Sequence, residues 1–451
     1  MTTAEMTAGK QGWKFPMDFW LANTMELFER AAYYGFFIVL TLYLTDIVGF
    51  SDKETGIVAG IFYGGLYLLP PFVGAISDRI GFKNGLIVAF SLLTLGYAML
   101  GLQPVVESKV MVILFLLVVM VGSSFIKPLI TGTVAKTTTE TNRARGYSLF
   151  YWVVNIGAFS GKTFVPFIRQ GMGLRHVNFF SAGMAFAALL FAIFVFKNIE
   201  APSERKSVRE VSQALVKILT TPRLIILTLI VAGFWTIQGQ MYATMPKYII
   251  RMVGPWAKPE WIANVNPAVV VLFVVLITHW TKKYRAVTAM LMGMILMPFS
   301  ALAMSAGPWL QHLTGNSIPF LGMILHPFTV MMIVGIAIQG LAECFISPRF
   351  LEFFSLMAPK GEEGVYLGFS HLHSFISALV GFFMSGFLLD AYCPDPKTLT
   401  GLTEAEKTAC YAHAHYIWYY FVAIGFAAAI ALFIFRLVTT RSEGPSRDSD
   451  L

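Results

Sequence analysis

The sequence predicts an all-α membrane protein whose twelve transmembrane helices form two bundles of six. The chain of 451 residues is 56% hydrophobic, its mean hydropathy is +0.67, and only 13% of its residues are charged. Soluble domains carry about 25% charged residues. The apolar residues recur in segments of about 20 or more, the length that crosses a bilayer as a helix. One polar stretch in mid-chain divides these segments into two equal sets.

The predicted spans are distributed over the whole chain, with no soluble domain between them. They lie near 17–45, 54–77, 84–103, 109–136, 144–169, 177–198, 222–248, 262–281, 287–306, 319–348, 364–391 and 413–437. We therefore expect an N-terminal bundle over 1–198, a linker over 199–221, a C-terminal bundle over 222–438 and a tail over 439–451. The spacing in the linker fits either a short amphipathic helix on the membrane surface or a plain solvated segment.

The basic residues predict the orientation of these helices. With the N-terminus inside, the inner loops and tails hold more than twice as many Lys and Arg as the outer loops. This bias places the linker, the tail and both termini in the cytoplasm. It also accounts for the net charge of +8 without a nucleic acid partner, since no water-facing domain gathers the basic residues. We expect a multi-pass protein of the plasma membrane, although an organellar membrane would give the same pattern.

Charged residues within the predicted spans are the first candidates for a functional site. An ionisable group at membrane depth costs several kcal/mol unless it is paired or hydrated. The first span carries Glu26, Glu29 and Arg30, and Glu26 and Arg30 lie one helical turn apart. Lys127 lies in the fourth span and Glu343 in the tenth. Charges that only lock helices together are the alternative, but carboxylates, cations and helix-breaking prolines at similar depth favour a transport site.

The fifth span carries a further lysine, Lys162, together with Asn155. The sequence does not fix the depth of Lys162, so its need for a partner stays open.

A loop motif after the second span resembles a signature of the major facilitator superfamily. The run GAISDRIGFK places Gly74, Asp78, Arg79, Gly81 and Lys83 at the spacing of that family's inner-loop motif. The resemblance implies two six-helix bundles and a gating role for Asp78 and Arg79. An ordinary charged turn is the alternative reading.

Further motifs resemble the proton-coupled oligopeptide transporters within that superfamily. Two of these motifs are specific: Glu26-x-x-Glu29-Arg30-x-x-Tyr33-Tyr34-Gly35 and Phe150-Tyr151-x-x-Val154-Asn155-x-Gly157. Weaker matches follow in the same order as in the family: Ile126-Lys127-Pro128, Trp235, Gln240, Asn266-Pro267, Glu343 and Ser347-Pro348.

The resemblance assigns roles to these residues. It implies that Glu26, Glu29 and Arg30 take part in proton coupling, that Lys127 helps bind the substrate carboxylate, and that Glu343 faces the substrate amino group. A zwitterion needs such a positive and a negative pole about a peptide length apart. Arg30 would also contact the substrate. Hydrogen bonds and aromatic walls would come from Tyr33, Tyr34, Asn155, Trp235 and Asn266.

Two departures from the family predict a divergent member. Gly239 stands where the family has an acid four residues after the tryptophan of the seventh span, so an expected partner of Arg30 is missing. The linker of about twenty residues is also too short for the two extra spans that bacterial members commonly carry.

We expect a secondary active transporter that moves di- or tripeptides, or similar zwitterions, together with protons by alternating access. Its partners would be the solute, protons and the bilayer. The alternative is a facilitator or exporter of another small amphiphilic or anionic metabolite without proton coupling, which Gly239 favours. A membrane enzyme or a non-transporting receptor is the hypothesis from another class.

We expect neither a cofactor nor a metal site nor enzyme activity. The pairs His371/His373 and His413/His415 would diverge by about 200° on a helix, which disfavours joint metal binding. The sequence contains no HExxH, phosphate-loop or GxSxG motif. Cys393 and Cys410 fall in one predicted outer loop and either pair or remain free thiols.

Overall fold

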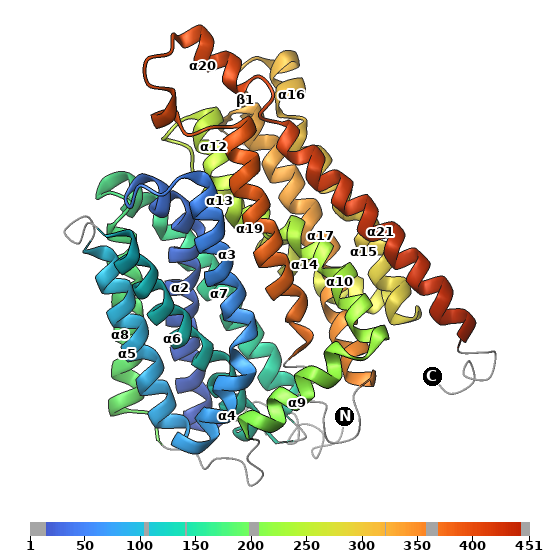
Figure 1. Cartoon of the computed structure of the whole chain (residues 1–451). Coiled ribbons are helices and arrows are strands. Elements are labelled where there is room, and N and C mark those ends of the chain that lie inside the picture. The colour runs from blue at the N-terminus through green and yellow to red at the C-terminus, as the bar shows by residue number, and fades with distance from the viewer. Residues whose placement is uncertain are drawn as a thin grey trace. The chain divides into compact units, whose positions relative to one another are not determined.

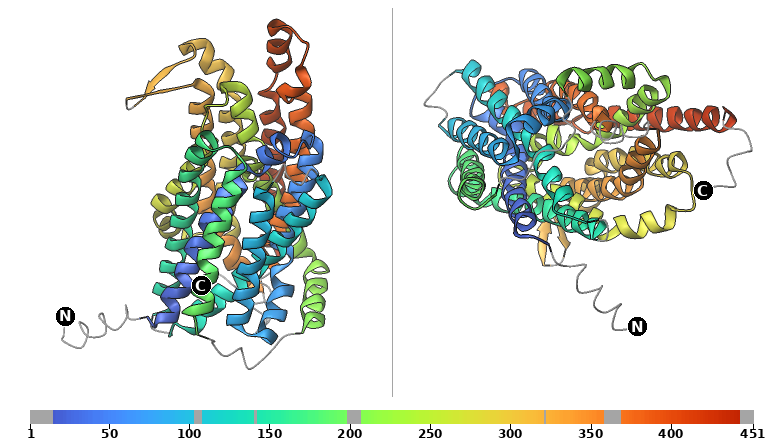
Figure 2. Two further views of the ribbon diagram at one scale, coloured as in Figure 1. Left: turned by 90° about the vertical axis from the view of Figure 1, so that its left-hand side faces the viewer. Right: turned by 90° about the horizontal axis from the view of Figure 1, so that it is seen from below.

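The computed structural model describes residues 15–102, 108–139, 142–197, 207–320, 322–357 and 369–442. Almost all of these residues are helical, which confirms the predicted all-α class. The chain divides into two compact units (Figure 1). Unit 1 comprises residues 1–49 and 65–213, and unit 2 comprises residues 50–64 and 214–451. Within each unit the long helices run side by side (Figure 2).

The described helices account for the twelve predicted spans. Ten helices are long and apolar enough to cross a membrane, and a bent pair, α3 (Asp52–Leu68) with α4 (Pro70–Ile80), supplies an eleventh span. The pair bends by 47° at Leu69, where two prolines follow. Helix α7 (Arg143–Gly171) is the twelfth; it is 29 residues long, but its basic side chains lower its mean hydropathy.

Unit 1 is built around helix α2 (Met17–Asp46), of whose most apolar stretch 78% is buried. It packs against α7 and against α8 (His176–Phe194), where the Ser181 hydroxyl donates a 2.8 Å hydrogen bond to the Ala32 carbonyl. Helix α5 (Phe82–Gly101) packs on α8 and on α6 (Lys109–Lys136). Gly81 turns the chain from α4 into α5 with a φ of +85°, a conformation that favours glycine.

Unit 2 is built around helices α15 (Ala286–Ser305) and α17 (Pro327–Met357), which pack closely. Helix α21 (Tyr416–Ser442) packs on α15, and α14 (Val265–Thr281) packs on α17. Helix α10 (Pro222–Gln238) packs on α21 and on α19 (Leu372–Tyr392). Short helices complete the unit: α11 (Gln240–Ala243), α12 (Met245–Val253), α13 (Pro259–Ala263), α16 (Gly307–Thr314), the 3-10 turn η1 (Pro396–Leu399) and α20 (Glu404–Tyr411).

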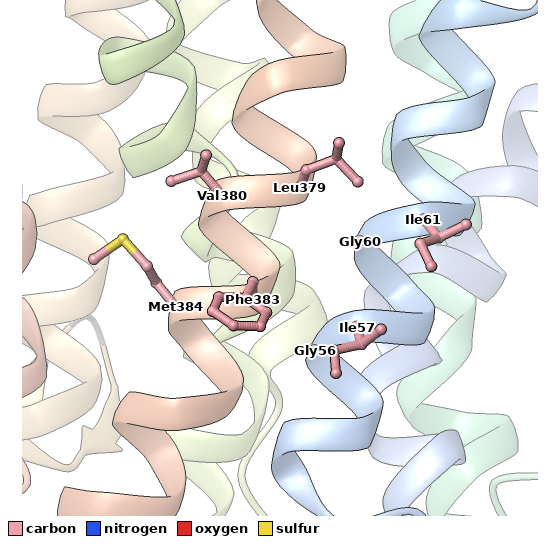
Figure 3. Close-up of a pocket in the computed structure, with 8 residues that line it drawn as sticks. All are labelled: Gly56, Ile57, Gly60, Ile61, Leu379, Val380, Phe383 and Met384. Atoms are coloured by element: carbon pink, nitrogen blue, oxygen red, sulfur yellow. The ribbon is translucent and has the colours of Figure 1, made fainter.

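The first part of α3 belongs to unit 2 because its glycines pack on α19. Gly56, Gly60 and Gly64 recur every four residues, and an added Cβ at Gly56 would lie 2.4 Å from the Phe382 carbonyl oxygen. Small residues at this spacing let two membrane helices approach closely. Beside this contact, an open groove of about 360 Å³ is lined only by apolar residues, which suits acyl chains (Figure 3).

Two of the predicted spans differ from the structure. The span expected over 319–348 begins at Pro327, because residues 318–325 form a hairpin of strands β1 (Ile318–Phe320) and β2 (Met323–Leu325). Gly322, with a φ of +78°, permits that turn. The hairpin projects sideways from one end of the helices of unit 2 (Figure 2). The span expected over 222–248 is divided at Gly239 and Thr244 into three helices.

The linker contains a helix, α9 (Val208–Leu219), which agrees with the amphipathic alternative. Val211 and Ile218 are buried two turns apart, while Arg209 and Glu210 are exposed. A reciprocal capping pair begins the helix: Ser207 N donates to Glu210 Oε2 at 2.6 Å, and Glu210 N donates to Ser207 Oγ at 3.2 Å. The first part of the linker, at 199–206, and the tail beyond 442 lie outside the described residues.

Candidate functional site

The charged residues of α2 form a dry cluster in the interior of unit 1. Glu26 is 2% exposed, Glu29 is 1% exposed and Arg30 is 9% exposed. Arg30 Nε lies 3.2 Å from Glu26 Oε1 and donates to Glu29 Oε2 at 2.5 Å, and a terminal guanidinium nitrogen also contacts Glu29. One guanidinium therefore serves two carboxylates, as the i, i+4 and adjacent positions on one helix allow.

The second oxygen of each carboxylate is unpaired within the described residues. Glu26 Oε2 and Glu29 Oε1 are buried without a hydrogen-bond partner. Buried polar atoms are almost always hydrogen-bonded, and two buried carboxylates on one cation leave a surplus negative charge. A proton on either carboxyl group would remove that surplus, so the cluster has the composition of a proton-binding site.

Two tyrosines form an aromatic wall beside this cluster. The guanidinium carbon of Arg30 lies 5.2 Å from the ring centre of Tyr33 and 5.9 Å from that of Tyr34. The two rings meet edge to face at 5.1 Å. Tyr33 is buried, whereas Tyr34 is partly exposed and therefore accessible to a solute.

Lys127 on α6 differs from Arg30 in being exposed. Its Nζ lies 5.3 Å from the ring centre of Tyr67, and the charge is close enough to Glu26 and Glu29 to act on both. Pro128 follows it in the helix and is in contact range of Gly74 on α4. Unit 1 thus presents one accessible cation beside one dry ionic cluster.

Helix α7 brings Asn155 and Lys162 to the same unit. The Asn155 amide nitrogen donates to the Tyr151 carbonyl on its own helix at 2.8 Å. Lys162 is 1% exposed, so the open question of its depth is answered: it is a core residue, with its Nζ 5.5 Å from the ring centre of Tyr34.

Glu343 is the centre of a second arrangement, in unit 2. Its Oε2 accepts hydrogen bonds from Gln238 Nε2 at 2.9 Å and from Asn266 Nδ2 at 3.1 Å. Helices α17, α10 and α14 each contribute one of these side chains. Glu343 is only partly buried, so neutral amides hold a carboxylate that remains accessible.

Trp235 is held by stacking on a neighbouring ring. Its ring lies 5.3 Å from that of His373, with an angle of 9° between the planes, and Phe350 meets His373 edge to face at 4.8 Å. His373 thus supports the tryptophan. The ring of His371 lies 6.0 Å from the ring of His373. Within the described residues, no three potential ligands gather around a metal position.

Sequence reasoning missed Gln238 and a buried ionic cluster in unit 2. Asp52 Oδ1 accepts from Lys247 Nζ at 2.6 Å, and Asp52 Oδ2 accepts from Arg251 Nη1 at 2.8 Å. Lys247 and Arg251 lie one turn apart on α12, and this spacing is the signal that could have indicated a shared partner.

Two further expectations concern the thiols and the inner loop. Cys344, Cys393 and Cys410 are free, so the pairing of Cys393 with Cys410 is not formed.

Arg79 is exposed at the end of α4. The side chain of Asp78 lies outside the described part of the structure, so the gating role of both residues stays a prediction.

Comparison with known proteins adds relatives of two kinds. The chain is 24% identical over 440 residues to dipeptide and tripeptide permease B of Salmonella typhimurium, covering 82% of this chain and 87% of the relative. It is 22% identical over 368 residues to multidrug resistance protein MdtH of Blochmanniella pennsylvanica, covering 81% and 84%.

Solved structures share the fold at low sequence identity. The POT family transporter PepTSo matches with a TM-score of 0.72 and 19% identity, over 95% of this chain and 99% of that one. A POT family transporter in complex with 5-aminolevulinic acid matches with a TM-score of 0.70 and 16% identity, over 94% and 96%. The sequence model of the Major Facilitator Superfamily matches residues 24–316, which is more than half of the chain. With its helical spans and two compact units, the chain therefore belongs to the Major Facilitator Superfamily.

Proposed function

We propose that this protein is a proton-coupled symporter of di- or tripeptides or peptide-like zwitterions, working by alternating access, and that it is not an enzyme. The observation that carries the proposal is the dry cluster of Arg30 with Glu26 and Glu29. Its surplus negative charge and its two unpaired carboxylate oxygens give a proton a favourable place to bind.

Unit 1 supplies positive charge for the carboxylate of the solute, and unit 2 supplies negative charge for its amino group. Lys127 is an exposed cation, and with Arg30 it suits the carboxylate of a peptide. Glu343 is an accessible carboxylate oriented by Gln238 and Asn266, and it suits the amino group. Tyr33, Tyr34, Asn155 and Trp235 would complete the site as hydrogen-bonding and aromatic walls. The named activity of the Salmonella relative supports the same solute class.

In this mechanism, protonation controls how tightly Arg30 is held. When Glu26 and Glu29 are both ionised, Arg30 is bound between them; a proton on one carboxyl group weakens that hold and frees part of the guanidinium for the solute carboxylate. Proton entry down its gradient would then drive accumulation of the solute. Asp78 and Arg79 would act in gating on the inner side, with both termini in the cytoplasm and the protein in the plasma membrane.

The alternative is a facilitator or exporter of an amphiphilic or anionic metabolite without proton coupling. Gly239 favours it, because this position lacks the acid that the resemblance leads us to expect as a partner of Arg30. The similarity to multidrug resistance protein MdtH also favours it.

Uptake by purified protein in liposomes distinguishes the two. We expect labelled Ala-Ala to accumulate when the outside is acidic and the inside negative, and an uncoupler to abolish accumulation but not exchange. Lys127→Met should lose accumulation, whereas Lys109→Met, a change at the exposed start of the same helix, should not. Uptake that ignores the uncoupler and is not competed by peptides would support the alternative.

A further inference from the structure

Lys162 is a charged residue of the core that the proposed mechanism does not use. It lies on α7, where Gly157 and Gly161 bring α2 and α7 into backbone contact: an added Cβ at Gly161 would lie 2.4 Å from the Ala31 carbonyl oxygen. The lysine beside this contact is 1% exposed and is among the largest fully buried side chains of the described chain. Burial of a lysine at such a position is costly, so its retention calls for a specific role.

The lysine shares one aromatic ring with the arginine of the ionic cluster. Lys162 Nζ lies 5.5 Å from the ring centre of Tyr34, and the guanidinium carbon of Arg30 lies 5.9 Å from the same ring centre. Tyr34 is itself partly exposed. Only the ring of Tyr34 therefore separates the charge of Lys162 from a surface that a bound solute can contact.

This cation changes the charge balance of unit 1. Away from the helix ends, the described spans of unit 1 carry two carboxylates, Glu26 and Glu29, and three cations, Arg30, Lys127 and Lys162. The cluster of Arg30 with Glu26 and Glu29 is negative by itself, but Lys127 and Lys162 outside the cluster make the sum over these spans positive, and a bound proton makes that sum more positive. Coulomb interactions weaken only slowly with distance in a low-dielectric interior.

We propose that Lys162 is a specificity-determining residue that makes the transporter prefer solutes with an added negative charge, such as dipeptides with an acidic side chain. The inference rests on the proposed function and names the solute class of the same site. Lys162 acts through the electrostatic potential at Tyr34 and not by touching the solute.

Competition between matched dipeptides tests the proposal. Uptake of labelled Ala-Ala is measured at pH 7, where a glutamate side chain is ionised, with Ala-Glu or its neutral isostere Ala-Gln as competitor. The wild-type protein should prefer Ala-Glu. The charge of Lys162, acting on the extra carboxylate of Ala-Glu across about 10 Å at intermediate dielectric, corresponds to an affinity about tenfold higher for Ala-Glu than for Ala-Gln. Lys162→Met should remove this preference, and Lys162→Arg should retain it, because the arginine restores the charge.

Controls separate specificity from folding and from the proposed function. Lys109→Met removes a lysine at the exposed start of α6 and should leave the preference unchanged. If Lys162→Met does not accumulate in the membrane, Lys162→Gln takes its place, and it too should lose the preference for Ala-Glu over Ala-Gln. Absence of Ala-Ala uptake by the wild type would refute peptide transport itself. Normal uptake with equal competition by both dipeptides, or a preference that survives loss of the charge, would overturn only the role of Lys162.

Discussion

Two carboxylates in the middle of long helices, Glu29 and Glu343, lie in contrasting surroundings. Glu29 is 1% exposed and its partner is a guanidinium that it shares with Glu26. Glu343 is partly exposed and its partners are the neutral amides of Gln238 and Asn266. A charge shared in a dry interior responds strongly to one proton, whereas a carboxylate held by amides keeps its charge available to a ligand. The contrast in surroundings supports the proposed division of tasks, in which Glu29 takes part in proton coupling and Glu343 in solute binding.

The largest effect should come from removing the cation of the dry cluster. Arg30→Met leaves two buried carboxylates without their partner, and breaking a buried ion pair in this way costs about 3–5 kcal/mol. We expect a clear loss of thermal stability in detergent together with a loss of uptake. Arg175→Met, at an exposed position, serves as the control. A normal melting temperature for Arg30→Met would show that the cluster does not depend on its arginine.

Removing the accessible carboxylate should affect binding and not folding. Glu343→Gln keeps the shape and can still hydrogen-bond to its neighbours, but it removes the negative pole for the solute amino group. We expect Ala-Ala uptake to fall about 30-fold or more, the effect of truncating a buried charge pair, at an unchanged melting temperature. Glu352→Gln, an exposed acid on the same helix, should transport normally. Equal uptake by both variants would remove Glu343 from the site.

If the dry cluster binds the coupling proton as proposed, its loss should separate exchange from accumulation. Glu29→Gln mimics a permanently protonated carboxyl group, so Glu26 and Arg30 remain as a balanced pair without the surplus negative charge that would bind a proton. We expect Ala-Ala exchange to continue while gradient-driven accumulation is lost. Glu404→Gln, on the exposed helix α20, should retain both. Accumulation by Glu29→Gln at the wild-type level would assign coupling to another residue.

The smallest effect should come from one amide beside Glu343. Gln238→Leu removes a hydrogen bond to a charged group, worth about 1.5 kcal/mol or more, which corresponds to roughly a tenfold rise in KM. The maximal rate should change little, because Asn266 still orients the carboxylate. Gln213→Leu, at an exposed position of α9, is the matched control. A fall in the maximal rate alone would place Gln238 in the conformational cycle instead.

The fold was predictable because hydrophobic length and loop charge are properties of segments. The helix-breaking prolines at 70 and 71 and the glycines of α3 did not prevent a correct assignment of the span, since the apolar length survives the bend. The hairpin at 318–325 was missed because its apolar residues are indistinguishable from the start of a span. Its Gly322 turn was the only local signal.

The site was predictable only where a motif or a helical spacing carried it. The i, i+4 spacing of Glu26 and Arg30 led to a pair that the structure forms. Contacts between helices distant in sequence were out of reach, because no periodicity relates Gln238 on α10 to Glu343 on α17. The same holds for Asp52 with Lys247, which are 195 residues apart.

The dryness of the Glu26–Glu29–Arg30 cluster also has a kinetic consequence. Because Glu26 and Glu29 are each no more than 2% exposed, we expect protons to reach these carboxylates only when unit 1 opens locally. The rate at which these carboxylates gain or lose a proton is then governed by the frequency of such openings. It should depend steeply on temperature and only weakly on buffer concentration.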